Sequence, residues 1–203
     1  MVVGDGLDTD VIVDPFRELL SKTDATSSAS VALFGALIDA IENVNYHAYP
    51  KGNLQVEKVP HSWWLSGSVS GGSRQLTVSL YDQGITIPAS LRLSGLYNET
   101  FKAYERLFKS DPWDDPKIDQ QSLKWAFNTA ETVSRLNHRG KGLPNIRSMV
   151  AECPEGRLLV LSGKGKYLYN NGIETFETMD LPLSGTYVEM SAIFPIMSVS
   201  NDE

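Results

Sequence analysis

The sequence predicts an α+β protein, a two-layer α/β sandwich in which a mixed sheet carries helices on one face. The first observation is the order of the patterns: a long helical repeat, a group of strands, a helical middle part and a second group of strands. Such grouping is typical of a sheet that helices cover on one side. The second observation is size, because 203 residues, 41% of them hydrophobic, suit one domain with its own core.

The domain proper is expected to span residues 27–203, after a leader or tether over residues 1–26. Glycines and a serine-rich polar run dominate this leader, which contains one short helix pattern. The domain then begins with a long helix, whose apolar residues recur at three- and four-residue spacing from Val31 to Val44. Three extended segments are expected next, over residues 54–59, 63–69 and 75–80.

The second half of the chain is expected to be helical first and extended afterwards. Helices are predicted over residues 97–108 and 121–136, separated by a segment whose prolines interrupt a helix. A third helix is predicted from near Pro144 to Cys153. The tail is expected to form three strands, over residues 157–161, 166–169 and 186–194. Gly163-Lys164-Gly165 is interpreted as the hairpin turn between the first two of these strands.

Composition narrows the classes of function. The formal net charge is −7 and no run of Lys or Arg stands out, so neither nucleic acid nor an anionic membrane is an expected partner. No apolar run approaches the roughly 18 residues of a membrane-spanning helix, and the N-terminus lacks a signal-peptide pattern. The single cysteine excludes an internal disulfide and a multi-cysteine zinc site. These features predict a cytoplasmic protein.

Polar residues on the first long helix are the first candidates for chemistry. Asp39, Asn43 and His47 recur every four residues, which places their side chains on one stripe of the helix. The stripe is either a solvated helix face or a surface that faces a ligand. In the second case Asn43 offers a neutral oxygen to Mg²⁺, and Asp39 offers a base for a water molecule.

A carboxylate ends the most regular strand pattern, in the segment SLYDQGITIP. Asp82 and Gly84 in this segment fit a plain turn, which is the more usual meaning of so short a motif. They also fit a site in which the strand directs Asp82 at a ligand while Gly84 lets a flat group approach the backbone. The motif by itself leaves both interpretations open.

A glycine-rich segment, Gly140-Lys141-Gly142-Leu143, precedes the third helix. Free backbone N–H groups and the helix dipole favour a phosphate at such a helix start, and Lys141 adds positive charge. The segment matches neither the dinucleotide-binding fingerprint, because Asn145 stands where the third glycine belongs, nor the P-loop.

Taken in order, these motifs resemble the GHKL, or Bergerat-fold, ATPases, which include gyrase, the ninety-kilodalton heat-shock chaperone, histidine kinases and MutL. The resemblance covers roughly residues 27–195. It rests on the Asp/Asn helix, the strand ending Asp-x-Gly-x-x-Ile-Pro, the helical insert, Arg-Gly-x-Gly-Leu-x-Asn-Ile and the Gly-Thr that opens the last strand. Residues 38–49 are most similar to the small members of the anti-sigma-factor type.

The resemblance implies roles for individual residues. Asp82 would accept a hydrogen bond from the adenine amino group, Gly84 would leave room for the base, and Thr186 would support Asp82. Asn43 would bind Mg²⁺, and His47 would be either a phosphate contact or a polar residue at the helix end. The residues that would meet the phosphates are Gly140, Lys141, Gly142 and Leu143. Residues from about 89 to 139 would form a lid over the nucleotide.

The implied function is a Mg²⁺-dependent ATP-binding domain with slow hydrolysis or phosphotransfer, acting as a regulatory switch. Asp39 would be the catalytic base, although hydrolytic members of the family carry glutamate there, and the shorter side chain puts the rate in question. The alternative is a non-catalytic module that signals bound ATP or ADP to a protein partner. Further domains of a longer chain, or a second copy in a homodimer, are the other partners considered.

Overall fold

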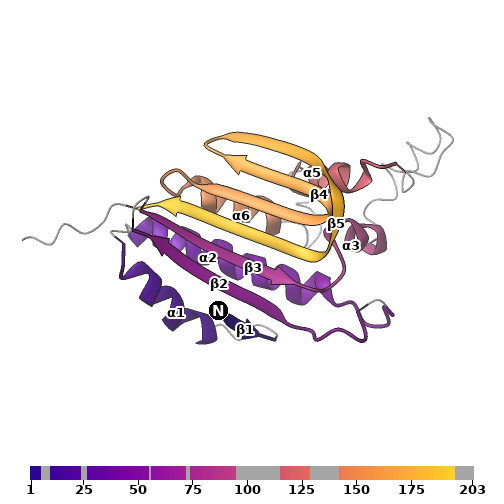
Figure 1. The fold of residues 1–203 in the computed structure, drawn as a ribbon, viewed down its shortest axis with the longest axis horizontal. Coiled ribbons are helices and arrows are strands. Elements are labelled where there is room, and N and C mark those ends of the chain that lie inside the picture. The colour runs from indigo at the N-terminus through magenta and orange to yellow at the C-terminus, as the bar shows by residue number, and fades with distance from the viewer. Residues whose placement is uncertain are drawn as a thin grey trace, which may run out of the picture.

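A single sheet covered by helices is the framework of the molecule (Figure 1). The computed structural model describes residues 1–5, 10–23, 27–54, 56–71, 74–94, 115–128 and 142–194. Its five strands lie in the order β1-β2-β3-β5-β4, and every pair of neighbours is antiparallel. The α+β class is therefore confirmed, and the arrangement is consistent with two layers. The expected mixed sheet is wrong for the described strands, because none of them pair in parallel.

The elements have the following bounds. The strands are β1 (Val2–Gly4), β2 (Trp63–Ser70), β3 (Gln75–Asp82), β4 (Arg157–Asn170) and β5 (Ile173–Ile193). The helices are α1 (Asp10–Leu20), α2 (Ser27–Asn43), α3 (Ile87–Ser94), α5 (Ile118–Asn128) and α6 (Gly142–Ala151). A π-helical segment, η1 (Val44–Ala48), directly continues α2.

The core lies between α2 and the sheet. Buried and less buried residues alternate strictly along β3, so that Leu76, Val78 and Leu80 face the helices. The fully buried Leu33 and Leu37 of α2 belong to the same cluster. Burial of each such leucine contributes roughly 1.5–3 kcal/mol, which makes this layer the main source of stability.

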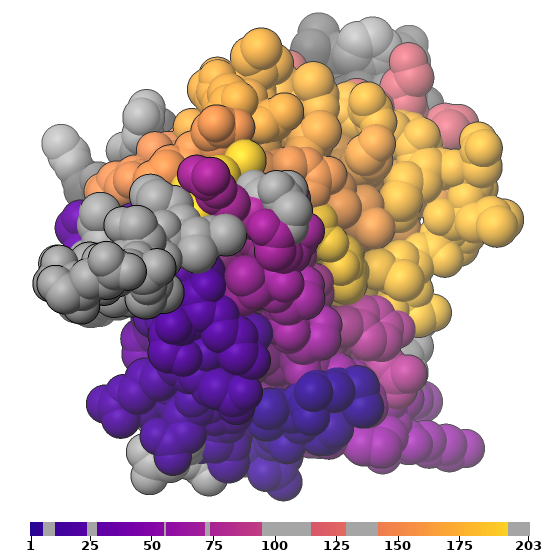
Figure 2. All heavy atoms as spheres, turned by 60° about the vertical axis from the view of Figure 1, so that its left-hand side comes forward, coloured from indigo at the N-terminus to yellow at the C-terminus, as the bar shows by residue number. Residues whose placement is uncertain are grey.

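The N-terminal segment is part of the fold, which corrects its expected role as a leader. Val2 pairs with Leu65 in the register of β1 and β2. Ile12 and Phe16 of α1 are buried in the core, and the ring of Phe16 lies 5.2 Å from that of Phe34. In the space-filling view the indigo N-terminal residues lie directly against the purple and magenta segments (Figure 2). These contacts tie β1 to the sheet and α1 to α2, and α1 contains most of the short helix pattern expected in the leader.

The C-terminal part consists of two long strands and not of three short ones. Gly163-Lys164-Gly165 lies inside β4 at a register irregularity, so its interpretation as a hairpin turn is wrong. The cause is α5, because Asp119 accepts the Lys164 N–H at 2.7 Å and its backbone leaves no space for a Cβ at Gly165. The turn between β4 and β5 is formed by Asn171 and Gly172, both at positive φ, which is the pattern of a type I′ hairpin.

One further segment differs from expectation, because residues 54 and 56–59 form turns and not an extended segment, with Val56 N–H donating to the Asn53 carbonyl at 3.1 Å. The helix expected over 97–108 lies outside the described residues. The helix expected over 121–136 is described only as far as residue 128, where it is α5, which buries Leu123 and Phe127 and stacks Phe127 on Tyr167 at 3.7 Å. This part of the expected lid is therefore packed against the β4–β5 hairpin.

Candidate functional site

Asp82 is the last residue of β3 and lies on its buried face. Only 3% of the residue is exposed, and its Oδ1 accepts the Gly84 N–H at 2.8 Å. Burial raises the pKa of the Asp82 carboxyl to about 7, and the backbone N–H groups of Gly84 and Thr186 partly oppose this rise. The turn suggested by the motif is confirmed, but it leaves the carboxyl group buried and not solvated.

Gly84 has a structural role that its motif did not reveal. A Cβ at this position would collide with the Ala48 backbone, which belongs to the end of η1. The Ala48 carbonyl also accepts the Ile85 N–H at 2.7 Å. The absence of a side chain at Gly84 thus lets the end of η1 reach the end of β3.

Ser162 of β4 is hydrogen-bonded to the start of α3 and to β5 at Thr186, the register partner of Asp82. It was not among the predicted site residues. It is fully buried in β4, and its Oγ accepts the Ile87 N–H at the start of α3 at 2.8 Å. The same Oγ lies 2.9 Å from Thr186 Oγ1 and 3.2 Å from the Gly185 carbonyl. A signal existed in the sequence, because Ser162 continues the alternation of Leu158 and Val160 and so had to face the core.

A second polar cluster forms where α2 meets α6. It contains Asp39 and Asn43 of α2 and Gly142 and Asn145 of α6. Asp39 shares a hydrogen bond with the Asn145 side chain. A Cβ on Gly142 would collide with the side-chain amide of Asn43, so the start of α6 lies against this amide. Asp39 and Asn43, two of the three residues of the stripe, therefore do not lie on a solvated helix face.

This cluster holds buried polar atoms that lack a hydrogen-bond partner among the described residues. They are Asp39 Oδ2 and Asn43 Nδ2, and Asn45 Nδ2 in η1 is a third such atom. Desolvation raises the pKa of Asp39, the Asn145 hydrogen bond opposes the rise, and the nearby charge of Glu42 adds to it. Buried polar groups are rarely left unsatisfied in proteins, so these atoms call for a ligand, an ion or a water.

The π-helical segment η1 joins the two clusters. It begins directly after Asn43 and ends at Ala48, which bonds to the turn after Asp82. Tyr49 follows, and its hydroxyl donates to the Ser62 carbonyl at 2.7 Å and accepts the Gln83 N–H at 3.2 Å. A π-helical turn is rare and is often found at functional sites. Tyr49 was not predicted, because its partners Ser62 and Gln83, which flank β2 and β3, are distant in sequence.

The other predicted site residues have varied outcomes. Leu143 is half-buried and packs against the core, and Thr186 pairs with Asp82 in the register of β3 and β5. His47 lies exposed on η1. Gly140 and Lys141 lie outside the described residues. The structure thus brings Asp82, Gly84 and Thr186 together at one place, and Asp39, Asn43 and Gly142 at another.

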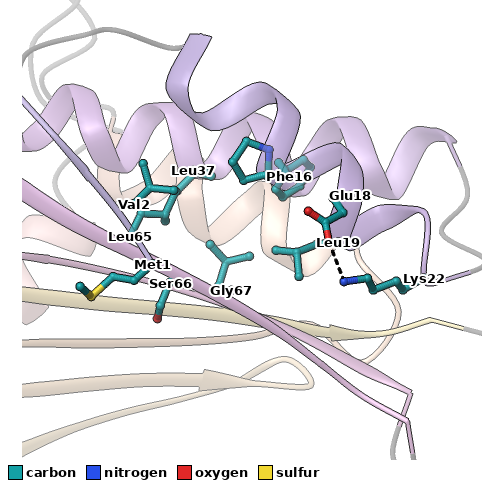
Figure 3. Close-up of a pocket in the computed structure, with 12 residues that line it drawn as sticks. Met1, Val2, Phe16, Glu18, Leu19, Lys22, Leu37, Leu65, Ser66 and Gly67 are labelled. Atoms are coloured by element: carbon teal, nitrogen blue, oxygen red, sulfur yellow. Dashed lines mark hydrogen bonds and ion pairs between the residues drawn. The ribbon is translucent and has the colours of Figure 1, made fainter.

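Two pockets of the described structure are lined by neither Asp82 nor Asn43. One, of about 470 Å³, is lined by Asp5, Asn45, Tyr49 and His61. The other, of about 250 Å³, lies between α1, α2 and the sheet (Figure 3). The apolar side chains of Leu37 and Leu65 line the latter, and the Glu18–Lys22 ion pair of 3.0 Å borders it.

Comparison with known proteins finds no matching family model and no matching curated protein. Across the described ranges, no group of three or more His, Cys, Asp or Glu side chains is placed to hold a metal ion. In the same ranges, no helix combines the length and hydropathy needed to cross a membrane.

Proposed function

We propose that the protein is a Mg²⁺-dependent adenine-nucleotide-binding domain of the Bergerat type, which works as a regulatory switch in the cytoplasm. The observation that carries the proposal is the buried Asp82 carboxyl at the end of β3. A carboxylate without a charged partner is costly to bury, and among the described groups Asp82 is offset only by backbone N–H donors. A ligand that donates to it would reduce that cost.

The adenine amino group is such a donor. A carboxylate offers about four lone-pair sites, and the N–H groups of Gly84 and Thr186 use only part of them. Guanine has a carbonyl oxygen in place of the amino group, so it would set an acceptor against Asp82. An unpaired buried acceptor costs about 1–3 kcal/mol, which predicts a preference for ATP over GTP of roughly 5- to 150-fold.

The second cluster fits the phosphate and metal end of the same ligand. Rotation of the Asn43 amide exchanges its oxygen and nitrogen, so Asn43 can offer a neutral oxygen to Mg²⁺, as hard cations prefer. The start of α6 next to Gly142 presents backbone N–H groups to an anion. The orphaned Asp39 Oδ2 and Asn43 Nδ2 are the polar atoms that such a ligand would satisfy. When bound, Mg²⁺ would neutralise charge on the phosphates.

Asp39 is the residue proposed to act on water, either in hydrolysis or in phosphotransfer to a partner protein. Its desolvated carboxyl has a raised pKa, which makes it a stronger base when ionised. A second candidate function is the non-catalytic module that reports nucleotide occupancy. The Asp39–Asn145 hydrogen bond favours it, because that bond engages the carboxylate that would have to reach the water.

Titration calorimetry tests the proposal. The wild type should bind ATP and ADP more tightly in Mg²⁺ than in EDTA, and GTP more weakly than ATP. Asp82→Asn should weaken ATP binding roughly 5- to 150-fold, which corresponds to 1–3 kcal/mol. Asp180→Asn, an exposed position on β5, is the matched control and should bind as the wild type does. Wild-type protein that binds no adenine nucleotide in either buffer would refute the proposal.

A further inference from the structure

A row of apolar and aromatic side chains crosses the sheet on the face that turns away from the helices. We call it the aromatic row, and its members in spatial order are Val3, Trp64, Tyr81, Tyr187 and Leu161. Each residue is the register partner of the next, so the row takes one position from each of the five strands. The adjacent core positions on β3, Leu80 and Asp82, are buried, so the row lies on the opposite face.

The rings of this row are held in place. Trp64 and Tyr81 have ring centroids 5.9 Å apart. The Tyr81 hydroxyl donates to the Ser184 carbonyl at 2.9 Å, and the Tyr187 hydroxyl donates to Glu189 Oε2 at 2.8 Å. Large aromatic side chains that are already ordered lose little conformational entropy on binding, which is a property of good interface anchors.

The remainder of this face is mainly polar and electrically balanced. Its neighbouring rows are formed mainly by small polar residues: Ser66, Ser68, Thr77, Ser79 and Ser191. The described charges on these rows are Arg157 and Glu189, which pair with each other at 2.7 Å. The chain as a whole carries −7, so this face is one where two copies could approach without strong repulsion.

We propose that this face binds a second copy of the chain, sheet against sheet. A two-fold axis parallel to the strands, midway between two facing sheets, reverses the strand order of one copy relative to the other. The aliphatic ends then meet, Val3 of one copy against Leu161 of the other. Trp64 meets Tyr187 in the same way, and Tyr81 on the central strand meets its own copy. The row is thus self-complementary, which is what an isologous dimer interface requires.

The face is also large enough. Eight residues on each of four strands and the three residues of β1, at about 4.8 Å strand spacing and about 3.3 Å rise, cover about 550 Å². Two such faces bury about 1,100 Å², which exceeds the roughly 1,000 Å² expected of a biological interface. Facing sheets pack about 10 Å apart, a distance that the aromatic row fills while the small polar rows permit close approach.

The first test is the oligomeric state of the full chain, measured by light scattering up to about 1 mM, where interactions near 4 kcal/mol become visible. The wild type should form a dimer. Tyr81→Glu should be a monomer, because it places two carboxylates opposite each other at the axis. Tyr46→Glu, at a position 69% exposed on η1, is the matched control and should remain a dimer. A monomeric wild type, or a dimeric Tyr81→Glu, would overturn the proposal.

A second test reads the geometry and guards against a variant that fails to fold. Val3→Glu changes an end of the row at a position 52% exposed, and it should weaken the dimer with an unchanged circular dichroism spectrum. Trp64→Lys and Tyr187→Glu are then mixed. The positive charge introduced on β2 of one copy would face the negative charge introduced on β5 of the other, so native mass spectrometry should find mixed dimers in excess over either homodimer. Random mixing, or no mixed dimer, would show that the two positions do not face each other.

Discussion

Replacement of Asp82 by asparagine should change the pH dependence of stability as well as nucleotide binding. The folded pKa of Asp82 is raised from its ordinary value of 3.8 to about 7, mainly by burial. The folded protein therefore binds this proton more tightly than the unfolded chain does. Below pH 4 the carboxyl is protonated in both states and its burial as a charged group costs no stability. As the pH rises from about 4 to about 7, the unfolded chain releases this proton while the folded protein keeps it, so the free energy of unfolding falls.

The size of the effect follows from the two pKa values. A change from 3.8 to about 7, at about 1.4 kcal/mol for each pH unit, gives about 4 kcal/mol of destabilisation once Asp82 is ionised. Asparagine removes this ionisation and keeps an oxygen that can accept the Gly84 N–H. Its buried NH₂ group replaces an acceptor and costs about 1–3 kcal/mol. The variant should thus be less stable than the wild type near pH 4 and more stable near pH 8.

Urea unfolding, followed by tryptophan fluorescence at pH 4 to 8, measures this directly. The difference in unfolding free energy between variant and wild type should change sign within this range. Subtracting the unfolding free energy of the wild type from that of the variant at each pH cancels the titration of all other groups. Asp180→Asn serves as the exposed control. A difference that is constant with pH would show that Asp82 titrates alike in the folded and unfolded chain, and it would refute the reasoning from burial.

Three further substitutions test other parts of the site. Asn43→Ala should remove most of the difference between ATP affinities in Mg²⁺ and in EDTA, because it deletes the proposed metal ligand; calorimetry showing the same difference would exclude that role. Ser162→Ala should lower the unfolding free energy by about 1–3 kcal/mol, because the Ile87 N–H loses its acceptor; a loss below about 0.5 kcal/mol in urea unfolding would contradict this. Asp39→Asn should keep ATP binding and reduce phosphate release about a hundredfold or more; wild-type release equal to that of the variant would favour the non-catalytic module.

The elements that the sequence predicted well are those with a strong local period. The alternation of residues 75–80 and the apolar face of 31–44 appear as β3 and α2, and the helix expected near Pro144 is α6. In each case the side chains that determine the pattern are also the ones buried in the core. Local and tertiary preferences agree there, so the pattern is sufficient.

Elements that depend on distant partners were not predictable in the same way. Three residues of β1 are too few to show a period, and the short helix pattern of the leader begins only at Pro15, whereas α1 begins at Asp10. Both elements persist because Val2 pairs with β2 and because Ile12 and Phe16 are buried in the core. Tertiary contacts outweigh the local preference in this part of the chain.

The Gly-Lys-Gly segment illustrates a different limit. Its glycines suit both a hairpin turn and an irregularity within a strand, because both need positive φ or close backbone approach. Asp119 and the backbone of α5 decide between the two, and they lie more than forty residues earlier in the chain. The Asn171-Gly172 pair was the more specific hairpin signal.

In the candidate site, too, local features were predictable from the sequence and features that depend on packing were not. Four-residue spacing on α2 predicted correctly that Asp39 and Asn43 share a face. That the start of α6 covers this face, with Asn145 bonded to Asp39, depends on how two helices pack and could not be inferred from spacing. The same holds for Ser162, whose partners come from two other segments.

The buried polar groups of the two clusters indicate that the protein binds a ligand, which the fold class by itself does not indicate. Asp82, Asp39 and Asn43 each bury polar atoms at a cost in stability. A nucleotide that satisfies both clusters would add RT ln(1 + [L]/Kd) to the stability, about 2.7 kcal/mol at a hundredfold excess over Kd.

The π-helical segment η1 contacts both clusters, so a ligand bound at either cluster would change the environment of the same segment. A switch of the proposed kind would therefore act through η1.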